Sequence, residues 1–291
     1  MCIVITGASG LLGRALMLTF SAYQPLGLAY SRANTNLHKI DLTDQQAIEQ
    51  FLFEHRPKII IHAAAERRPD ATKQHPEQAI ALNVAATQYL VKAAKAINAW
   101  LLYISTDYVF DGKYPPYQTT SQPNPLNLYG QSKWQGEKII LTQYDNACIL
   151  RIPILYGQVE FLTESSITAL FLLLNNPQAK VDHHAIRYPT LVDNVAKICL
   201  QLAEKSLANA FPQGILHYSD PEPYTKYEML QTMAKVMKKP FHHIIPIAQP
   251  IDKVPRPYHC QLAIHDLNQF NIKIPTACFK QTIFSILSTC C

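Results

Sequence analysis

Three side chains in the middle of the chain form a set that can reduce a carbonyl group. Thr106 ends an apolar run, and Tyr129 and Lys133 stand four positions apart, so on a helix they share one face. A lysine ammonium beside a phenol is expected to lower the pKa of the tyrosine from about 10, which makes Tyr129 a candidate general acid. Thr106 would donate a hydrogen bond to the carbonyl oxygen, and Lys133 would bind the ribose of a nicotinamide nucleotide that delivers hydride.

A glycine-rich turn near the start of the chain fits such a nucleotide. Residues 2–6 form a strand-like run, and glycines follow at 7, 10 and 13, spaced G-x-x-G-x-x-G, before a helical pattern. Glycines at these places allow a tight turn, close approach of the backbone to a pyrophosphate, and close packing of helix on strand. The helix N-terminus also favours phosphate oxygens. The turn predicts these nucleotide-binding residues: Gly7, Ser9, Gly10, Leu11, Leu12 and Gly13.

Residues that follow later strands extend the predicted nucleotide site. Ser31 and Arg32 come after the second strand, where Arg32 can pair with a 2′-phosphate, so NADP(H) is the expected cofactor and NAD(H) the alternative. A solvated arginine on a loop is the other interpretation of Arg32. Asp41 and Leu42 are placed to contact the adenine. At Ala63, Ala64 and Ala65, small side chains would let the protein backbone pass close to the cofactor.

The elements that must position these residues alternate along the first half of the chain. We expect strands at 2–6, 26–30, 59–62, 100–105 and 147–151, and between them helices at 11–20, 44–55, 76–98 and 132–143. Strands that alternate with helices pair in parallel through right-handed crossovers. The predicted fold class is therefore α/β, a doubly wound parallel sheet of the Rossmann type with a small C-terminal substrate-binding lobe.

The second half carries more prolines and predicts loops and short strands around two helices, at 190–205 and 225–237. A chain of 291 residues is long enough for one large domain or for a domain with a smaller appendage. We expect an NADP-binding Rossmann domain over 1–155, to which a helix near 190–205 returns. Residues 156–291 would then form mainly the substrate-binding lobe.

Composition narrows the function classes. The net charge of +5 is mild and the basic residues are scattered, which argues against nucleic-acid binding. No apolar run approaches the roughly 20 residues of a membrane span. Seven cysteines without a C-x-x-C pair indicate a reducing, cytoplasmic compartment. The histidine pairs at 183–184 and 242–243 lack other ligands at metal-binding spacing, so we expect no metal.

Longer stretches resemble the extended short-chain dehydrogenase/reductases, and among them the dTDP-4-dehydrorhamnose reductase group. The resemblance is carried by residues 104–112 (ISTDYVFDG), 128–133 (LYGQSK), 136–137 (GE) and 256–257 (RP). It implies NADPH-dependent reduction of the 4-keto group of a deoxy-sugar nucleotide, with Thr106, Tyr129 and Lys133 as the catalytic residues. We place a further cofactor contact at Ile154, and substrate contacts at Arg67, Asp107, Tyr108 and Arg256.

Two other stretches are similar to a non-catalytic family, the regulatory beta subunits of methionine adenosyltransferase. They are residues 65–70 (AERRPD) and 151–157 (RIPILYG). That family keeps the fold, NADP binding and the Tyr–Lys pair. The sugar reductases typically place a tryptophan where this chain has Ile154, and Ala263 replaces an aspartate usual in both groups. Arg67 and Arg68 can grip a diphosphate, belong to a protein interface, or lie on a solvated loop.

Two main functional hypotheses stay open. The leading one is an NADPH-dependent reductase with a nucleotide-sugar substrate. The alternative is an NADP-binding regulatory subunit that modulates a methionine adenosyltransferase, and a weaker third reading is an NADP-sensing regulator without a fixed enzyme partner. The predicted partners are correspondingly a nucleotide sugar, a second copy in a homodimer, or a methionine adenosyltransferase, but neither nucleic acid nor a membrane.

Overall fold

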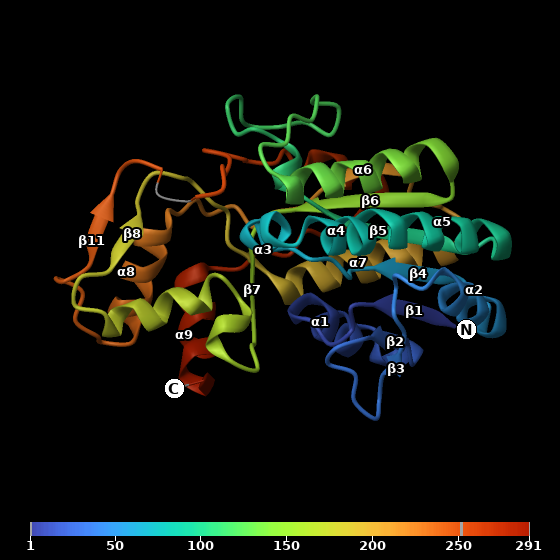
Figure 1. The fold of residues 1–291 in the computed structure, drawn as a ribbon, viewed down its shortest axis with the longest axis horizontal. Coiled ribbons are helices and arrows are strands. Elements are labelled where there is room, and N and C mark those ends of the chain that lie inside the picture. The colour runs from blue at the N-terminus through green and yellow to red at the C-terminus, as the bar shows by residue number, and fades with distance from the viewer. Residues whose placement is uncertain (1, 251–252, 291) are drawn as a thin grey trace.

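A computed structural model describes residues 2–250 and 253–290. Its centre is a seven-stranded parallel sheet with the order β10-β6-β5-β4-β1-β2-β3 (Figure 1). The strands are β1 Ile3–Thr6, β2 Leu26–Ala29, β3 His38–Lys39, β4 Ile59–His62, β5 Trp100–Thr106, β6 Ala147–Ile152 and β10 Gly214–His217. The predicted fold class is confirmed. The sequence did not predict the short β3 or the returning strand β10.

Helices cover both faces of the sheet. Helices α1 (Leu11–Thr19) and α7 (Val192–Leu207) share one core with Ile3 and Ile5, whereas α2 (Gln45–His55), α5 (Ala86–Ile97) and α6 (Leu128–Gln143) share another with Val4. Successive side chains of a strand point to opposite faces. A strand buried on both faces is therefore apolar throughout, which explains the unbroken apolar runs at β1 and β4.

The order of the strands locates the ligand-binding edge. Strands β2 and β4 lie on opposite sides of β1. The chain first adds strands on one side of β1 and then on the other, so the strand order switches between β1 and β4. In open parallel sheets, ligands bind in the crevice that this switch leaves at the carboxyl ends of the strands. Thr6, His62 and Thr106 end β1, β4 and β5 at that edge.

The helix predicted over 76–98 is divided. Helices α3 (Pro69–Gln74) and α4 (Pro76–Ile80) precede a π-helical turn, Ala81–Ala85, that continues into α5. This turn carries the buried Asn83, whose amide nitrogen donates to the Ser132 hydroxyl at 3.0 Å and to the Glu66 carbonyl at 3.0 Å. A π-turn often marks a functional position in a helix, and here it ties the loop after β4 to α6.

The remaining elements form a second body with its own core. Strand β7 (Leu155–Tyr156) pairs with β9 (Thr190–Leu191), and β8 (Lys180–Asp182) with β11 (Ile245–Ile247). Helices α8 (Lys226–Val236) and α9 (Phe279–Cys290) pack with these elements around a third apolar cluster. Short 3₁₀ turns occur at Ser21–Tyr23, Asp107–Val109, Leu162–Glu164, Thr168–Asn175 and His265–Phe270.

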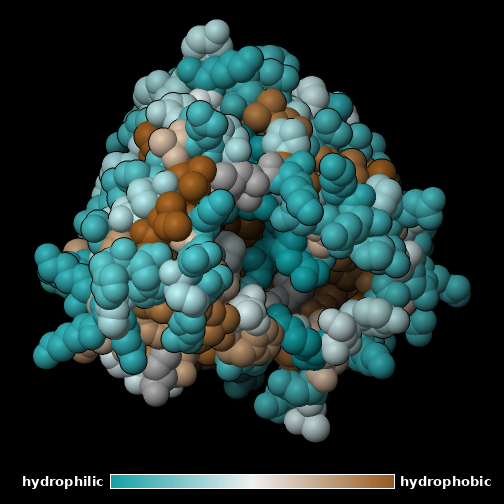
Figure 2. Space-filling model, turned by 60° about the vertical axis from the view of Figure 1, so that its left-hand side comes forward, coloured by the Kyte–Doolittle hydropathy of each residue, from teal (hydrophilic) through white to brown (hydrophobic). Residues whose placement is uncertain are grey.

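Figure 1 places β8, β11 and α8 to one side of the main sheet. Figure 2, which brings that side forward, shows a hollow near the middle of the face, with hydrophilic and hydrophobic side chains around it. Over residues 2–250 and 253–290, the structure contains no helix long and apolar enough to cross a membrane. The same ranges hold no group of three metal-ligating side chains.

A buried ion pair fastens α6 to the sheet. The Arg151 guanidinium on β6 donates to both oxygens of Glu137 at 2.9 and 2.7 Å, and each side chain is only 1% exposed. The hydroxyl of Ser105 on β5 also donates to Glu137, and Arg151 reaches His217 on β10 at 3.4 Å. One helix and three strands therefore meet at a single pair of charges.

We expect Arg151→Met to lower the free energy of unfolding by about 3–5 kcal/mol, because it leaves the Glu137 carboxylate buried without its counter-ion. The double variant Glu137→Leu/Arg151→Met should recover most of that loss, since it removes both charges. Urea denaturation of the three proteins measures this. A single variant within about 1 kcal/mol of the wild type would contradict the expectation.

Candidate active site and cofactor-binding edge

The glycine turn has the geometry that a pyrophosphate needs. Gly7 has a φ of +69°, and a Cβ there would lie 2.9 Å from the Ala64 backbone, so the turn touches the segment after β4. A Cβ on Gly13 would lie 2.0 Å from the Gly7 carbonyl oxygen. Helix α1 begins at Leu11 after Gly10, an N-cap residue that has no side chain to accept hydrogen bonds from the first backbone N–H groups of the helix. These residues fit a dinucleotide.

The other residues predicted for the nucleotide lie in different environments. Leu11, Leu12 and Leu42 are buried in the apolar cores, so a ligand could meet only their backbone. The segment after β4, Ala63, Ala64 and Ala65, is half-buried and touches the glycine turn. Ile154 is also half-buried and packs against the C-terminal core. Ser9 is half-buried and Ser31 is exposed. Asp41 accepts hydrogen bonds from the Thr43 amide and hydroxyl and so shapes its own turn.

The hydroxyl and the phenol predicted for catalysis lie close together. Asn127 caps α6 by accepting a hydrogen bond from the Gly130 amide at 3.0 Å, so this helix begins before the predicted residue 132 and includes Tyr129. The Tyr129 ring lies 5.9 Å from that of Tyr108, just beyond the end of β5. Burial raises the pKa of Tyr129, and a hydrogen bond with Thr106 acts against that rise. The structure thus brings these two catalytic candidates together.

The prediction that Lys133 lowers the pKa of Tyr129 is wrong. Burial, helped by the neighbouring Asp107, raises the pKa of Tyr129 to about 12. Lys133 is itself buried, with its ammonium 3.9 Å from the centre of the Tyr103 ring. Burial lowers the pKa of Lys133 to about 7, against the opposing effect of Glu137. An amine that is only partly charged near neutral pH opposes the effect of burial on the phenol pKa weakly.

A buried arginine that the sequence analysis missed faces the same region. Arg187 is 2% exposed and donates to the Pro257 carbonyl at 2.8 Å, and its guanidinium lies 5.8 Å from the Tyr108 ring. Within the described residues its Nη2 has no hydrogen-bond partner. Burial raises the pKa of Asp107 to about 7, although Arg187 acts to lower it. No local pattern pointed to Arg187, because only the fold brings residue 187 beside β5.

The three arginines predicted to contact cofactor or substrate are engaged with partners from the chain itself. Arg32 forms an ion pair with Glu164 at 2.8 Å. Arg67 donates to the backbone carbonyl of Glu164. Arg256 pairs with Asp70 at 2.7 Å. Arg32 and Arg67 thus meet at one residue of the C-terminal body, whereas Arg256 is paired elsewhere.

The pKa of Lys133 predicts a specific pH dependence of stability. Between its folded value, about 7, and its ordinary value, about 10.5, the unfolded chain binds a proton at Lys133 that the folded chain does not, so stability rises with pH. Lys133→Met should therefore stabilise the protein relative to wild type by about 3–4 kcal/mol more at pH 7 than at pH 10. Denaturation at both pH values measures the difference. Lys138→Met on the exposed side of α6 controls for a lost lysine, and a pH-independent difference for Lys133→Met would refute the assignment.

Comparison of this chain with known proteins identifies its family. The methionine adenosyltransferase 2 subunit beta of Xenopus tropicalis is 44% identical over 92% of this chain and 82% of its own length. The dTDP-4-dehydrorhamnose reductase of Aggregatibacter actinomycetemcomitans is 33% identical over 75% of this chain and 72% of its own. A solved structure of the Bacillus anthracis str. Ames dTDP-4-dehydrorhamnose reductase in complex with NADP superimposes with a TM-score of 0.80, at 24% identity, covering 99% of this chain and 98% of that one. A family model described as the RmlD substrate binding domain matches residues 1–290. The resemblances to both groups are confirmed, and the chain belongs to the RmlD substrate binding domain family.

Proposed function

We propose that this chain is an NADP(H)-binding regulatory subunit of a methionine adenosyltransferase. The observation that carries the proposal is the extent of its similarity to a beta subunit, 44% identity over 92% of the chain, against 33% over 75% for a reductase. The leading hypothesis from the sequence was the reductase. We now prefer the regulatory role to the reductase role, because the relatives with the higher identity are regulatory subunits.

The residues at the sheet edge support nucleotide binding. The backbone of the glycine turn and the first turn of α1 would hold the pyrophosphate, and Arg32 would meet the 2′-phosphate of NADP(H). Tyr129 and Lys133 would lie along the nicotinamide ribose. When bound, the nicotinamide supplies a hydride donor or acceptor.

The electrostatics support binding more strongly than proton transfer. A general acid works best when its pKa lies near the working pH, whereas that of Tyr129 is raised to about 12 by burial. Lys133 faces Tyr103 and has a lowered pKa, so it contributes little charge to a phenolate. Ile154 stands at the position where the resemblance to sugar reductases leads us to expect a tryptophan. The candidate acid Tyr129 therefore has a pKa far from neutral pH, which favours a binding role for this site.

A second candidate function is reduction of the 4-keto group of a deoxy-sugar nucleotide. One observation favours it: Thr106 and Tyr129 lie together at the end of β5, with Lys133 one turn further along α6. In that reaction Thr106 would orient the carbonyl, and Tyr129, protonated at neutral pH, would give its proton to the carbonyl oxygen as hydride arrives at carbon. The unmatched Nη2 of Arg187 lies in the region that would receive the sugar nucleotide.

The regulatory proposal predicts a stable complex with a methionine adenosyltransferase catalytic subunit. Mixed at micromolar concentrations, the two proteins should co-elute in size-exclusion chromatography, and the KM or kcat of S-adenosylmethionine synthesis should change by about twofold or more. Tyr129→Phe should preserve both effects, because a regulatory role does not use the phenol proton. Separate elution with unchanged kinetics would contradict the proposal.

The same proposal predicts no reductase turnover. NADPH oxidation in the presence of dTDP-4-dehydrorhamnose should stay at the rate seen without enzyme, for the wild type and for Tyr129→Phe alike. A wild-type rate that falls by a factor of roughly a hundred or more in Tyr129→Phe, with NADPH affinity retained, would establish the reductase function instead. The retained affinity separates a lost acid from a lost binding site.

A further inference from the structure

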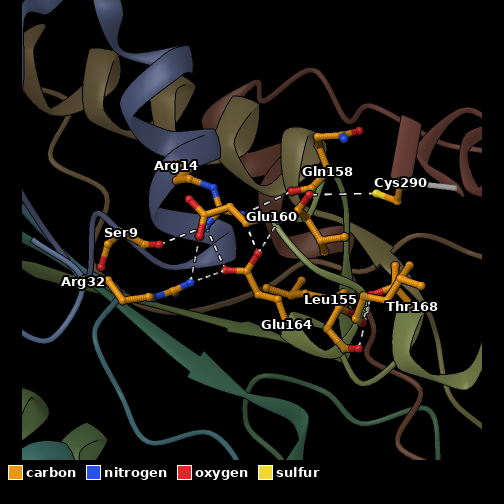
Figure 3. Close-up of polar contacts among 12 residues, drawn as sticks. Ser9, Arg14, Arg32, Leu155, Gln158, Glu160, Glu164, Thr168 and Cys290 are labelled. Atoms are coloured by element: carbon orange, nitrogen blue, oxygen red, sulfur yellow. Dashed lines mark hydrogen bonds and ion pairs between the residues drawn. The ribbon is translucent and has the colours of Figure 1, made fainter. Parts of the chain in front are cut away.

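Two acidic residues of the C-terminal body reach across to the nucleotide-binding turn. The Glu164 carboxylate accepts hydrogen bonds from Arg14 on α1, at 2.6 and 2.8 Å, and from Arg32 at 2.8 Å. Glu160 lies 3.2 Å from the same nitrogen of Arg32. Figure 3 shows both carboxylates aimed at the two arginines from the segment that precedes Thr168. Four charged side chains, far apart in sequence, thus meet in one network.

This network lies over the glycine turn itself. Nη2 of Arg32 lies 4.0 Å from the position that a Cβ on Gly10 would take, and Arg14 donates to the Ser9 carbonyl at 2.9 Å. The backbone carbonyl of Glu164 also accepts from Arg67, on the loop after β4. Glu164 is therefore held by three arginines, and it sits between the turn and that loop, where the fold would receive the phosphates of a dinucleotide.

The two acidic residues differ in burial and therefore in strength. The Glu164 side chain is 3% exposed, whereas that of Glu160 is 53% exposed. Burial alone would raise the pKa of Glu164, but the hydrogen bonds from Arg14 and Arg32 outweigh it and lower the pKa to about 2. Glu164 is thus ionised at neutral pH. Charge-assisted hydrogen bonds to a buried carboxylate are strong, whereas an exposed pair in solvent is weak.

We propose that the Glu164 carboxylate competes with the 2′-phosphate of NADP(H) for Arg32, and so sets the selectivity of this chain between NADP(H) and NAD(H). The inference rests on the proposed binding of a nicotinamide nucleotide. A guanidinium that binds the 2′-phosphate must release Glu164 or share its donors with it. A nucleotide without that phosphate leaves the Arg32–Glu164 pair intact, so the competition acts on NADP(H) alone.

Isothermal titration of the full chain with NADPH and with NADH tests this. Glu164→Gln keeps the shape of the side chain and removes its charge, so NADPH should bind on the order of tenfold more tightly while NADH changes by less than about twofold. Glu160→Gln, the matched change at the exposed carboxylate, should give a smaller gain of the same sign. In Glu164→Gln/Arg32→Ala the gain for NADPH should disappear, because the group under competition is gone.

Equal gains for NADPH and NADH, or unchanged NADPH affinity in both glutamine variants, would overturn the competition and indicate an ion pair that only links the two bodies. Binding of neither nucleotide by any variant would overturn the proposed cofactor binding, and the competition with it. Thermal melting of each variant identifies an unfolded protein. If Glu164→Gln does not fold, Glu160→Gln decides the matter through its NADPH-to-NADH ratio.

Discussion

The buried ion pair between Glu137 and Arg151 joins α6 to the central sheet, and the arrangement of the candidate site depends on that junction. It lies in the interior, where either charge alone would be strongly unfavourable, so α6 and β6 must keep their mutual position. Ser105 joins the pair from β5, one residue before Thr106, and α6 carries Tyr129 and Lys133. The pair therefore helps to hold α6, with its phenol and amine, against the strand that carries the Thr106 hydroxyl.

Burial also explains the electrostatics of the candidate catalytic residues. The same packing that positions Tyr129, Lys133 and Asp107 removes them from water, which raises the pKa of the two acids and lowers that of the amine. Each neutral form is favoured, so the positive charge needed beside the phenol is weakened. The proposed regulatory role does not require that charge, because nucleotide binding can rest on shape and hydrogen bonding.

Much of the fold and part of the site follow from local sequence patterns. The apolar runs, the spacing of Gly7, Gly10 and Gly13, and the four-residue step from Tyr129 to Lys133 are short-range features, and they predicted the sheet, the turn and one helix face. The pattern could not predict Arg187 or Glu164. Both reach the site from the C-terminal body through long-range packing, and nothing in their neighbours in the sequence marks them. The lowered pKa expected for Tyr129 failed for the same reason, since burial is a property of the fold.

The central claim is that a nicotinamide nucleotide binds at the carboxyl end of β1, where Glu164 competes with its 2′-phosphate for Arg32. A crystal structure of the protein grown with NADPH tests this claim most directly. We predict that the pyrophosphate lies over Gly10, that the 2′-phosphate pairs with Arg32, and that the Glu164 carboxylate has moved away from Arg32. A structure at saturating NADPH with no nucleotide at this edge would contradict the claim. So would one in which the Arg32–Glu164 pair is intact and the 2′-phosphate binds elsewhere.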